Sequence, residues 1–446
     1  MNSLISKFII IKHTKDISDF NKNYALLIRR PFINDEIIEL IEKKIIKEVF
    51  GTTETLSLYA KFEVKKTLVE KPNLAWSNFC FKKYPNLPKN IISVTGTNGK
   101  TSTCHYISQI LTAMKVPNVL INTIGIYENN IKIFNSPNST PDAALIHKVL
   151  NDFALKHTNG FAIIESTSIG IEECRVSNVR SNVAVFTNLT KEHMDYHKTM
   201  DNYLNAKMKL GEKSNKFFIH NSVNQNKFPK YGEQLVEIKY ENEKSVFVYQ
   251  FDEKIYEITV KLVGKFNAEN VLSAMIALKE FFPIESFVGF IQNLEPADGR
   301  LNKYGNIIID YAHTLDGVKN IFNAIKNDSV NKIIVVMGFG GNSDWTRLTE
   351  VSEFLQDNAD IVFLTTDNPK FCDPMEIALK AQKICSKAII ELYREKAILK
   401  AYEISKHNSQ SIVLVLGKGH EPYMSIKSEK IPYSDKETVM KIINLN

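Results

Sequence analysis

The feature that most constrains this chain is the segment Val94–Ser102, which reads Val-Thr-Gly-Thr-Asn-Gly-Lys-Thr-Ser. It follows a short β-branched run, 91–94, and precedes a helix-like segment. A strand, a glycine-containing turn and a helix start form a phosphate cradle, because backbone N–H groups and the helix dipole favour an anion. Lys100 can then reach the outer phosphates, and Thr101 can bind Mg²⁺. Val94 stands where the standard P-loop has its first glycine, so the segment indicates a narrower group of ATP users.

Length and composition are those of an ordinary globular protein. The 446 residues suffice for two to four domains, and 44% are hydrophobic and 24% charged. The net charge of +6 is mild for this length, and we expect no nucleic-acid partner. The five cysteines form no CxxC pair, which indicates reduced thiols. No apolar run approaches the roughly 18 residues of a membrane helix, and lysines bracket the run 9–11, so we expect a cytoplasmic protein with no signal peptide and no membrane partner.

Short β-rich runs alternate with helical patterns along the chain. This alternation predicts an α/β protein with parallel sheets buried on both faces, in which ligands gather at the carboxyl ends of the strands. A polar or glycine-bearing string follows each run directly. Residues 215–262 lack a helical period and predict strands and turns at the edge of the central domain. The runs are 91–94, 161–164, 183–187, 333–337, 361–365 and 412–416.

Two linkers divide the chain. Residues 84–88 contain two prolines and precede the phosphate loop, and residues 295–300 separate a helical stretch from a new strand, 307–310. The sequence therefore predicts three domains. Their expected ranges are 1–88, 89–300 and 301–446.

Polar residues after the next two runs are candidate metal ligands. Glu165 ends a buried run and is well placed to take the metal held by Thr101, although it could instead cap the following turn. His193 belongs to a cluster of histidines and carboxylates within residues 192–197. One turn and one helix could bring Lys207 beside it. A protonated lysine repels Mg²⁺, so Lys207 can serve there only if it is neutralised, for instance as a carbamate.

Further strings indicate nucleotide and substrate contacts. Asn267 offers a donor and an acceptor, which suits an adenine edge, but it could equally cap a helix. Four strings of the last third follow predicted strands, and their common position favours one shared cleft. They are 310–313, 338–341, 365–370 and 417–421.

Taken in order, these strings resemble the Mur ligase family over about residues 85–446, and within it the type that adds the third amino acid to a UDP-N-acetylmuramoyl-dipeptide. Gly96–Thr101 is common to Mur ligases and folylpolyglutamate synthases, so it indicates the chemistry rather than the substrate. The cluster 193–197, and the pairing of 367–369 with 417–421, resemble the dipeptide-ligase type specifically. The resemblance implies three domains: a small N-terminal substrate domain, a central parallel-sheet P-loop ATPase domain and a C-terminal Rossmann-like domain.

The resemblance also implies residue roles. ATP would contact Gly96, Thr97, Asn98, Gly99, Lys100, Thr101, Ser102, Asn267, Arg300 and Asp310. The metal ligands for two Mg²⁺ ions would be Thr101 with Glu165, and His193 with a carbamylated Lys207. The catalytic set would be Lys100, Glu165, His193 and Lys207. The UDP-sugar peptide and the incoming amino acid would contact Ser139, Thr140, Thr167, Ser168, Arg175, Asp367, Asn368, Lys370, Gly417 and Glu421.

The implied reaction activates a substrate carboxylate with ATP as an acyl phosphate, from which the amine of an amino acid then displaces phosphate. Lys370 stands where relatives that use meso-diaminopimelate have an arginine. It keeps the positive charge but loses the bidentate fork. With Glu421 able to meet a distal ammonium, we expect meso-diaminopimelate, and L-lysine second because Lys370 would repel it. The family further implies a monomer acting in peptidoglycan synthesis.

Two alternatives stay open. Another ligase of the Mur and folylpolyglutamate superfamily, with a different acyl substrate, is favoured by residues 1–88, where the uridine-binding strings of the family are not recognisable. A non-catalytic Mur-like binding protein would have lost the phosphate and metal residues first, whereas all of them are present. Asn342–Asp344 replaces the family's Asp-Arg-Asp, and its effect on nucleotide binding is open.

Overall fold

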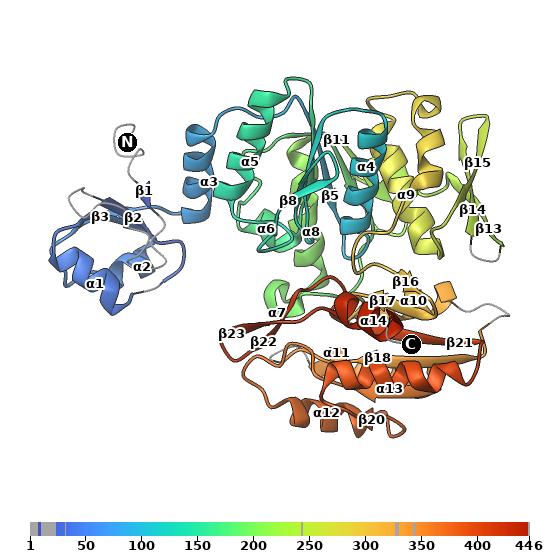
Figure 1. The fold of residues 1–446 in the computed structure, drawn as a ribbon. Helices are drawn as coiled ribbons and strands as arrows, with labels where there is room; N and C mark the ends of the chain where they lie inside the picture. The colour runs from blue at the N-terminus through green and yellow to red at the C-terminus, as the bar shows by residue number, and fades with distance from the viewer. Residues whose placement is uncertain are drawn as a thin grey trace.

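The computed structural model of the chain describes residues 8–9, 24–31, 33–241, 244–325, 330–341 and 345–444. In Figure 1 the N-terminal elements lie at the left, the helix α3 links them to the central part, and the C-terminal part lies below. The predicted α/β architecture is confirmed, while the domain boundaries at residues 88 and 300 stay predictions. Within the described ranges, no helix has the length and apolar character needed to cross a membrane. The segment Asn342–Asp344 lies outside the described residues.

The N-terminal part is a small parallel sheet with short helices. Its strands pair in the order β1-β2-β3-β4. The helices begin where polar side chains take up free amides: Asn34 accepts from Ile37 N, and Thr52 accepts from Thr55 N. The elements are β1 (Phe8–Ile9), β2 (Tyr24–Leu27), α1 (Asp35–Glu42), β3 (Ile46–Gly51), α2 (Thr53–Leu58), β4 (Lys65–Leu68) and α3 (Pro72–Lys83).

The central part contains an eight-stranded sheet among the described residues, in the order β12-β11-β10-β5-β9-β6-β7-β8. The predicted runs 91–94, 161–164 and 183–187 form the neighbouring parallel strands β5, β9 and β10. The sheet's elements are β5 (Asn90–Thr95), α4 (Lys100–Ala113), β6 (Asn118–Ile121), β7 (Ile126–Glu128), β8 (Ile131–Phe134), α5 (Ala143–Lys156), β9 (Phe161–Glu165), α6 (Ser168–Glu172), β10 (Ser181–Phe186), α7 (Met194–His197), α8 (Met200–Glu212), β11 (Ser214–His220) and β12 (Lys230–Tyr231).

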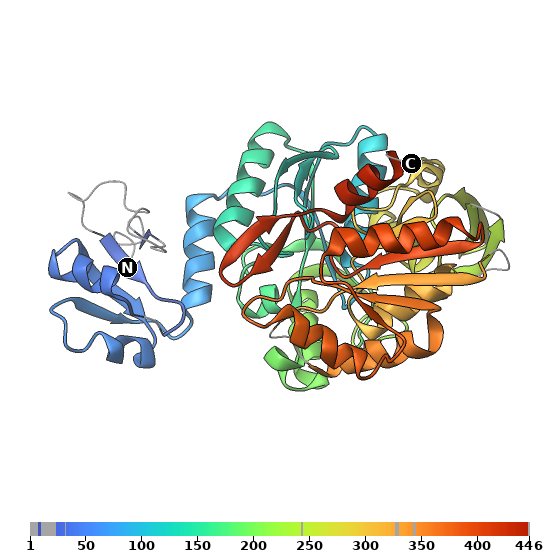
Figure 2. The ribbon, with the colours of Figure 1, turned by 60° about the horizontal axis from the view of Figure 1, so that its bottom comes forward.

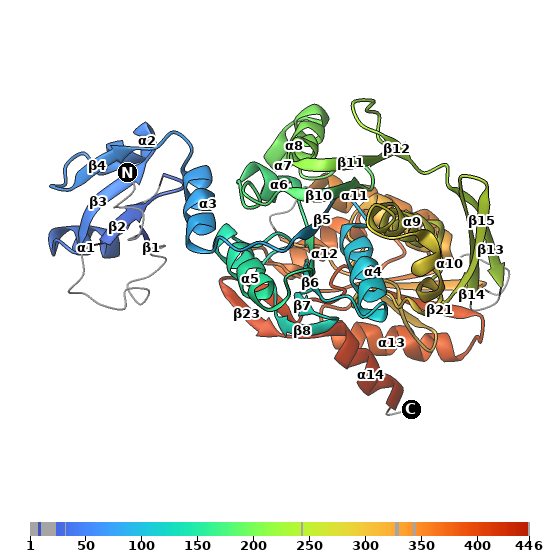
Figure 3. The ribbon, with the colours of Figure 1, turned by 90° about the horizontal axis from the view of Figure 1, so that it is seen from above.

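A second, antiparallel sheet covers the edge of the central part, as the missing helical period of residues 215–262 predicts. Its order is β13-β14-β15, and it lies beyond α9 when the molecule is seen from above (Figure 3). Phe247 and Tyr249 of this sheet pack with Val271 and Met275 in one buried core. The elements are β13 (Leu235–Glu241), β14 (Lys244–Phe251), β15 (Lys254–Val260), α9 (Lys265–Leu278) and the 3₁₀ turns η3 (Ile284–Ser286) and η4 (Val288–Asn293).

The C-terminal part is a six-stranded sheet among the described residues, in the order β16-β17-β21-β18-β19-β20, parallel except for β16. It contains the predicted strands 307–310, 333–337, 361–365 and 412–416. The elements are β16 (Asn302–Tyr304), β17 (Ile307–Asp310), α10 (Leu315–Ile325), β18 (Lys332–Met337), α11 (Trp345–Asn358), β19 (Ile361–Leu364), α12 (Pro374–Gln382), β20 (Ile389–Ile390), α13 (Arg394–Lys406), β21 (Ser411–Leu416), β22 (Tyr423–Ile426), β23 (Glu429–Pro432) and α14 (Asp435–Asn444).

A packing contact holds the N-terminal elements against the central part. The helix α3 packs on the start of α5, where Trp76 and Ala143 share a small core and Trp76 Nε1 donates to Asp142 Oδ1 over 2.7 Å. The hairpin β22–β23 extends toward the end of the molecule where α3 lies (Figures 1 and 2). Glu165 at the carboxyl end of β9 and Asp310 at the carboxyl end of β17 line one space between the central and C-terminal parts.

Candidate active site

The phosphate loop is held in place before any ligand binds. Lys100 is the first residue of α4, and its Nζ donates to the carbonyls of Thr97 over 2.6 Å and Gly96 over 3.1 Å. Asn188 Oδ1 accepts from the amide of Asn98 over 2.9 Å, and Thr187 Oγ1 donates to the carbonyl of Asn98 over 2.6 Å. Hydrogen bonds from the carboxyl end of β10 thus preorganise the loop that follows β5.

Two glycines of the loop have no room for a side chain. Gly99 adopts a φ of +81°, and a Cβ there would lie 2.1 Å from Asn270 Oδ1. A Cβ on Gly96 would lie 1.9 Å from Thr187 Oγ1. The loop therefore needs glycine at both positions.

Glu165 and Thr101 converge on one point, as the sequence predicts. Thr101 Oγ1 donates to Glu165 Oε2 over 3.0 Å, and the same carboxylate oxygen accepts from the amide and the hydroxyl of Thr123, each over 2.9 Å. A carboxylate and a hydroxyl oxygen suit Mg²⁺, which takes one or two protein oxygens and completes its shell with phosphates and water. The described residues contain no group of three or more His, Cys, Asp or Glu that could bind a metal alone. A magnesium ion there would therefore be shared with the nucleotide.

Lys207 and His193 both lie close to the Tyr203 ring. The ring centroids of His193 and Tyr203 are 6.2 Å apart, and Lys207 Nζ lies 4.4 Å from the Tyr203 centroid. Lys207 is buried, and its Nζ donates to the carbonyl of Gly96 over 2.6 Å. Burial, reinforced by the nearby Lys100 charge, sets the pKa of Lys207 well below its ordinary value. A neutral amine is the form that can react with CO₂, so the site fits a carbamate.

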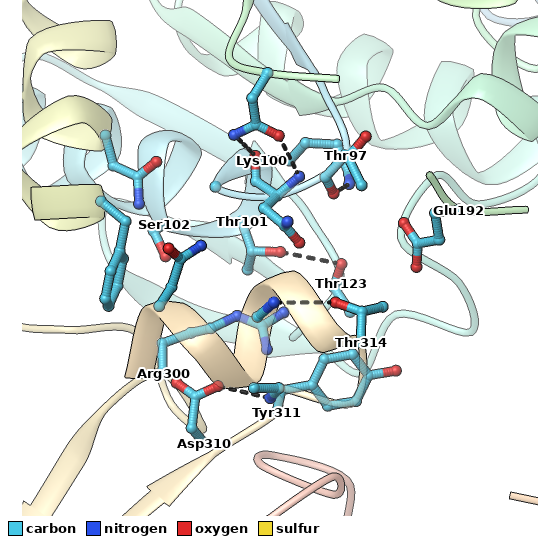
Figure 4. A pocket seen from close by; sticks show the side chains of 18 of the residues that line it. Thr97, Lys100, Thr101, Ser102, Thr123, Glu192, Arg300, Asp310, Tyr311 and Thr314 are labelled. Carbon is cyan, nitrogen blue, oxygen red and sulfur yellow. Dashed lines mark hydrogen bonds between the residues drawn. The ribbon is translucent and has the colours of Figure 1, made fainter. Parts of the chain in front are cut away.

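The opposite wall comes from the C-terminal part (Figure 4). Asp310 ends β17 and accepts from the amides of Leu301 over 2.7 Å and Ala312 over 2.6 Å, which fixes the turn that carries Arg300. The Arg300 guanidinium lies 4.6 Å from the centroid of the Tyr311 ring. Burial raises the pKa of Asp310. Across the gap, Asn98 Nδ2 donates to Asp316 of α10 over 2.6 Å, so the phosphate loop contacts the C-terminal part directly.

These walls enclose a cavity of about 440 Å³. Most predicted nucleotide and metal residues line it: Thr97, Asn98, Gly99, Lys100, Thr101, Ser102, Glu165, His193, Arg300 and Asp310. Gly96 and Lys207 lie directly behind the loop and are joined by their hydrogen bond. The cavity is large enough for a nucleoside triphosphate, and its glycine-containing loop with Lys100 is suited to bind the phosphates.

Asn267 does not line this cavity. It is buried, it accepts from Tyr106 Oη over 2.8 Å, and it donates to the carbonyl of Val263 over 2.9 Å. Nor does it cap the helix, because Gly264 is the N-cap of α9. Phe266 and Asn270 line the cavity instead, and sequence reasoning missed both. The adenine contact of Asn267 stays a prediction.

Other residues of the cavity were also missed. Thr123 follows the carboxyl end of β6, so the strand-end rule could have indicated it. Glu192 lies between His193 and His313, with Nε2 of each ring 3.7 Å from one of its carboxylate oxygens. Burial would raise the pKa of Glu192, but the interaction with His313 and the neighbouring positive charges outweigh it and lower the pKa.

The predicted UDP-substrate residues form a wall next to this cavity. Ser139 and Thr167 line it. Thr140 Oγ1 donates to the carbonyl of Glu165 over 2.8 Å, and Arg175 Nη1 donates to the carbonyl of Thr140 over 2.6 Å. Ser168 Oγ lies 2.9 Å from His197 Nε2 and outside the cavity lining. Their substrate contacts stay predictions.

A second cavity, of about 310 Å³, contains all the predicted amino-acid residues of the C-terminal part. They are Asp367, Asn368, Lys370, Gly417 and Glu421. Tyr311 and His313 line both cavities, so the two spaces adjoin. Residues from all four strings, 310–313, 338–341, 365–370 and 417–421, line the second cavity, which confirms the expectation of one shared cleft. Arg347, Tyr423 and Ser425 also line the second cavity, and no strand-end or turn signal marked them as ligands.

Comparisons with known proteins agree with this arrangement. Residues 94–278 match the Mur ligase middle domain, and residues 299–419 match the glutamate ligase domain of Mur ligases. The UDP-N-acetylmuramoyl-L-alanyl-D-glutamate–2,6-diaminopimelate ligase of Aquifex aeolicus is 34% identical over 80% of this chain and 78% of its own length. The enzyme of that name from Fusobacterium nucleatum is 33% identical over 81% of this chain and 79% of its own length.

Solved structures show the same fold. A UDP-N-acetylmuramoyl-L-alanyl-D-glutamate–2,6-diaminopimelate ligase structure superposes with a TM-score of 0.61 at 22% identity, covering 98% of this chain and 94% of that one. MurF ligase from Thermotoga maritima in complex with ADP gives 0.63 at 14% identity, covering 100% of this chain and 99% of that one. The matched domains and the curated relatives together show that this chain belongs to the Mur ligase family and is an ATP-dependent ligase.

Proposed function

We propose that this protein joins meso-diaminopimelate to UDP-N-acetylmuramoyl-L-Ala-D-Glu, using ATP and Mg²⁺, in peptidoglycan synthesis. The observation that carries the proposal is the shared wall of the two cavities, formed by Tyr311 and His313. An acyl phosphate made in the first cavity would face an amine held in the second. The curated relatives at 33–34% identity that carry this activity in their names support the choice of substrates.

In the first step, an oxygen of the D-Glu side-chain carboxylate attacks the γ-phosphorus of ATP, and the bond to the β-phosphate oxygen breaks to release ADP. The amides of the loop and Lys100 bind and orient the phosphates. Thr101 with Glu165, and His193 with carbamylated Lys207, would hold Mg²⁺ ions, which neutralise phosphate charge when bound. Arg300, fixed by Asp310, faces the nucleotide from the C-terminal side.

In the second step, the amine of the amino acid attacks the acyl carbon and forms a tetrahedral intermediate. The C–O bond to phosphate then breaks, and the proton lost by the new amide nitrogen leaves with the inorganic phosphate. Asp367, Asn368 and Glu421 lie where they can orient the ammonium groups of the amino acid. The adjoining walls exclude water, which would otherwise hydrolyse the acyl phosphate.

The sugar peptide would extend from the first cavity toward the N-terminal part. Arg29 Nη1 pairs with Asp142 Oδ2 over 2.7 Å, and Arg30 pairs with Glu173, which also binds Arg175. These ion pairs join the end of β2 to the wall of predicted substrate residues. We further propose that the enzyme is a cytoplasmic monomer, as the resemblance to the Mur ligase family implies.

A direct assay tests the proposal. The protein is incubated with ATP, Mg²⁺ and UDP-N-acetylmuramoyl-L-Ala-D-Glu, with meso-diaminopimelate or L-lysine offered separately, and phosphate release and product mass are followed. We expect a UDP-tripeptide with meso-diaminopimelate and much less product with L-lysine. No product with either amino acid would refute the proposal and favour a different acyl substrate.

A further inference from the structure

The second cavity contains two basic side chains without a partner. Arg347 and Lys370 line it, and neither side chain makes a hydrogen bond or an ion pair in the part of the chain that the structure describes. Arg347 lies in the first turn of α11, and Lys370 follows Asn368 and Pro369 after β19. Two unpaired cations on the wall of one small cavity are suited to bind anionic groups of a ligand.

The acidic side chains of this cavity are already occupied. Lys418 Nζ is buried, 3.2 Å from Glu421 Oε2 and 3.4 Å from Asp367 Oδ1. Asn368 Nδ2 donates to Glu421 Oε2 over 2.7 Å. Among the described residues at this cavity, and counting Lys418, three basic groups stand against two acidic ones, so the described wall carries an excess positive charge.

The loop that carries Lys370 packs closely against the loop that follows β18. The amide of Gly341 donates to the carbonyl of Asn368 over 2.8 Å, and a Cβ on Gly341 would lie 1.7 Å from the Pro369 carbonyl oxygen. Leu348, next to Arg347, is buried in the core of the C-terminal sheet and anchors the start of α11. The loop that carries Lys370 therefore packs against the loop after β18, and the first turn of α11, which carries Arg347, is anchored in the core.

We propose that Arg347 is a specificity-determining residue that binds one carboxylate of the incoming amino acid, while Lys370 faces the other. The inference rests on the proposed function and deepens it. Arg347 supplies the planar, bidentate fork that Lys370 lacks. An amino acid with two carboxylates and two ammonium groups pairs both cations, whereas L-lysine, with a single carboxylate and a net positive charge, leaves one cation unpaired against a positive wall.

Steady-state kinetics of four proteins test this proposal. They are the wild type, Arg347→Ala, Arg347→Lys and the control Lys383→Ala, which removes an exposed positive charge of the same domain outside the cavity. For Arg347→Ala we expect the KM for meso-diaminopimelate to rise about 10- to 100-fold, the scale of a charged hydrogen-bonded pair, with the KM for ATP unchanged. Arg347→Lys should recover part of the loss, and kcat/KM for L-lysine should not fall in either variant.

The outcomes separate this inference from the proposed function. A wild type that makes no product with meso-diaminopimelate would refute both. A wild type that uses meso-diaminopimelate, together with an Arg347→Ala variant whose preference over L-lysine equals that of Lys383→Ala, would overturn the role of Arg347 alone. An Arg347→Ala variant that loses the use of both amino acids equally would also overturn it, because the effect would then not be one of specificity.

Discussion

The two cavities of this protein differ in how their charged groups are held before any ligand binds. Around the phosphate loop, Lys100 and Lys207 both donate to loop carbonyls, and Glu165 accepts from Thr101 and Thr123. In the second cavity Arg347 and Lys370 have no partner in the described part of the chain. The charged groups named for the first cavity are therefore already hydrogen-bonded. Arg347 and Lys370 of the second cavity remain available to pair with a ligand.

This difference separates two tasks. Phosphoryl transfer depends on groups that are already oriented when charge develops, so a preorganised network favours the chemical step. Selection of an amino acid depends on the difference in binding free energy between similar ligands, which unpaired charges can supply. We therefore expect changes around the phosphate loop to lower turnover with every amino acid, and changes in the second cavity to alter selectivity.

Replacing Lys207 should give the largest effect. Lys207→Ala would remove the proposed carbamate ligand, and we expect kcat to fall by about 10²- to 10³-fold or more, with either amino acid. Short carboxylates such as formate or acetate should restore part of the rate. The control is Lys209→Ala on the same helix, whose Nζ pairs with Glu172 near the surface. Full activity of Lys207→Ala would contradict the carbamate and its place in the network.

A methyl group on Gly99 should disturb the loop itself. Gly99→Ala forces an L side chain into a φ of +81° and places its Cβ 2.1 Å from Asn270 Oδ1. We expect the KM for ATP to rise at least about tenfold while the preference between amino acids is unchanged. Gly289→Ala is the matched control, because a Cβ there meets nothing within 4 Å. Equal ATP binding by the two variants would show that the loop is not as tightly fitted as its contacts indicate.

Removing Lys370 tests the second cavity. Lys370 is exposed, so we expect Lys370→Ala to raise the KM for meso-diaminopimelate only about three- to tenfold, less than Arg347→Ala, and to leave the KM for ATP unchanged. Lys441→Ala, an exposed lysine of α14, is the control. If Lys370→Ala instead changed the KM for ATP and left the amino-acid preference unchanged, the second cavity would not be the site that selects the amino acid.

His147, a buried histidine outside both cavities, should affect the pH dependence of the free energy of unfolding without affecting substrate binding. His147 is buried, neither of its ring nitrogens has a hydrogen-bond partner among the described residues, and burial lowers its pKa from 6.5 to about 4. Between these values the unfolded chain binds a proton that the folded chain does not, so stability falls as the pH drops. The loss is about 2 kcal/mol between pH 7.5 and pH 5.

His147→Leu should remove that part of the pH dependence. Urea unfolding at pH 7.5 and pH 5 measures it, with His407→Leu, an exposed position, as the control. We expect the variant to lose less stability on acidification than the wild type, with the ATP and amino-acid KM values unchanged. An identical loss in the variant and the wild type would contradict this account of His147.

The sequence predicted the first cavity better than the second. Gly96–Thr101, Glu165 and His193 are local strings at strand ends, and parallel sheets bring such ends together, so their convergence followed from periodicity alone. Asn270 lies one helical turn after Asn267, and only the packing of α9 decides which of the two side chains faces the nucleotide space. From the sequence we predicted Asn267. Its side-chain amide accepts from Tyr106 and donates to the carbonyl of Val263.

The second cavity depended more on tertiary contacts. Asp367, Asn368 and Glu421 could be predicted because they follow strands. Arg347 lies in the first turn of a helix, where no strand-end rule marks it, although it lines the same cavity. The ion pairs of Arg29 and Arg30 could not be foreseen either, because they join residues more than a hundred positions apart across two domains. Long-range packing, rather than local propensity, decided these positions.

The central claim is that the first cavity activates a carboxylate as an acyl phosphate for an amine held in the second. Isotope transfer tests it most directly. UDP-N-acetylmuramoyl-L-Ala-D-Glu is labelled with ¹⁸O in the D-Glu side-chain carboxylate, turned over with ATP, Mg²⁺ and meso-diaminopimelate, and the released phosphate is weighed by mass spectrometry. The account predicts one labelled oxygen in each phosphate released. Phosphate without label, alongside amide product, would contradict it.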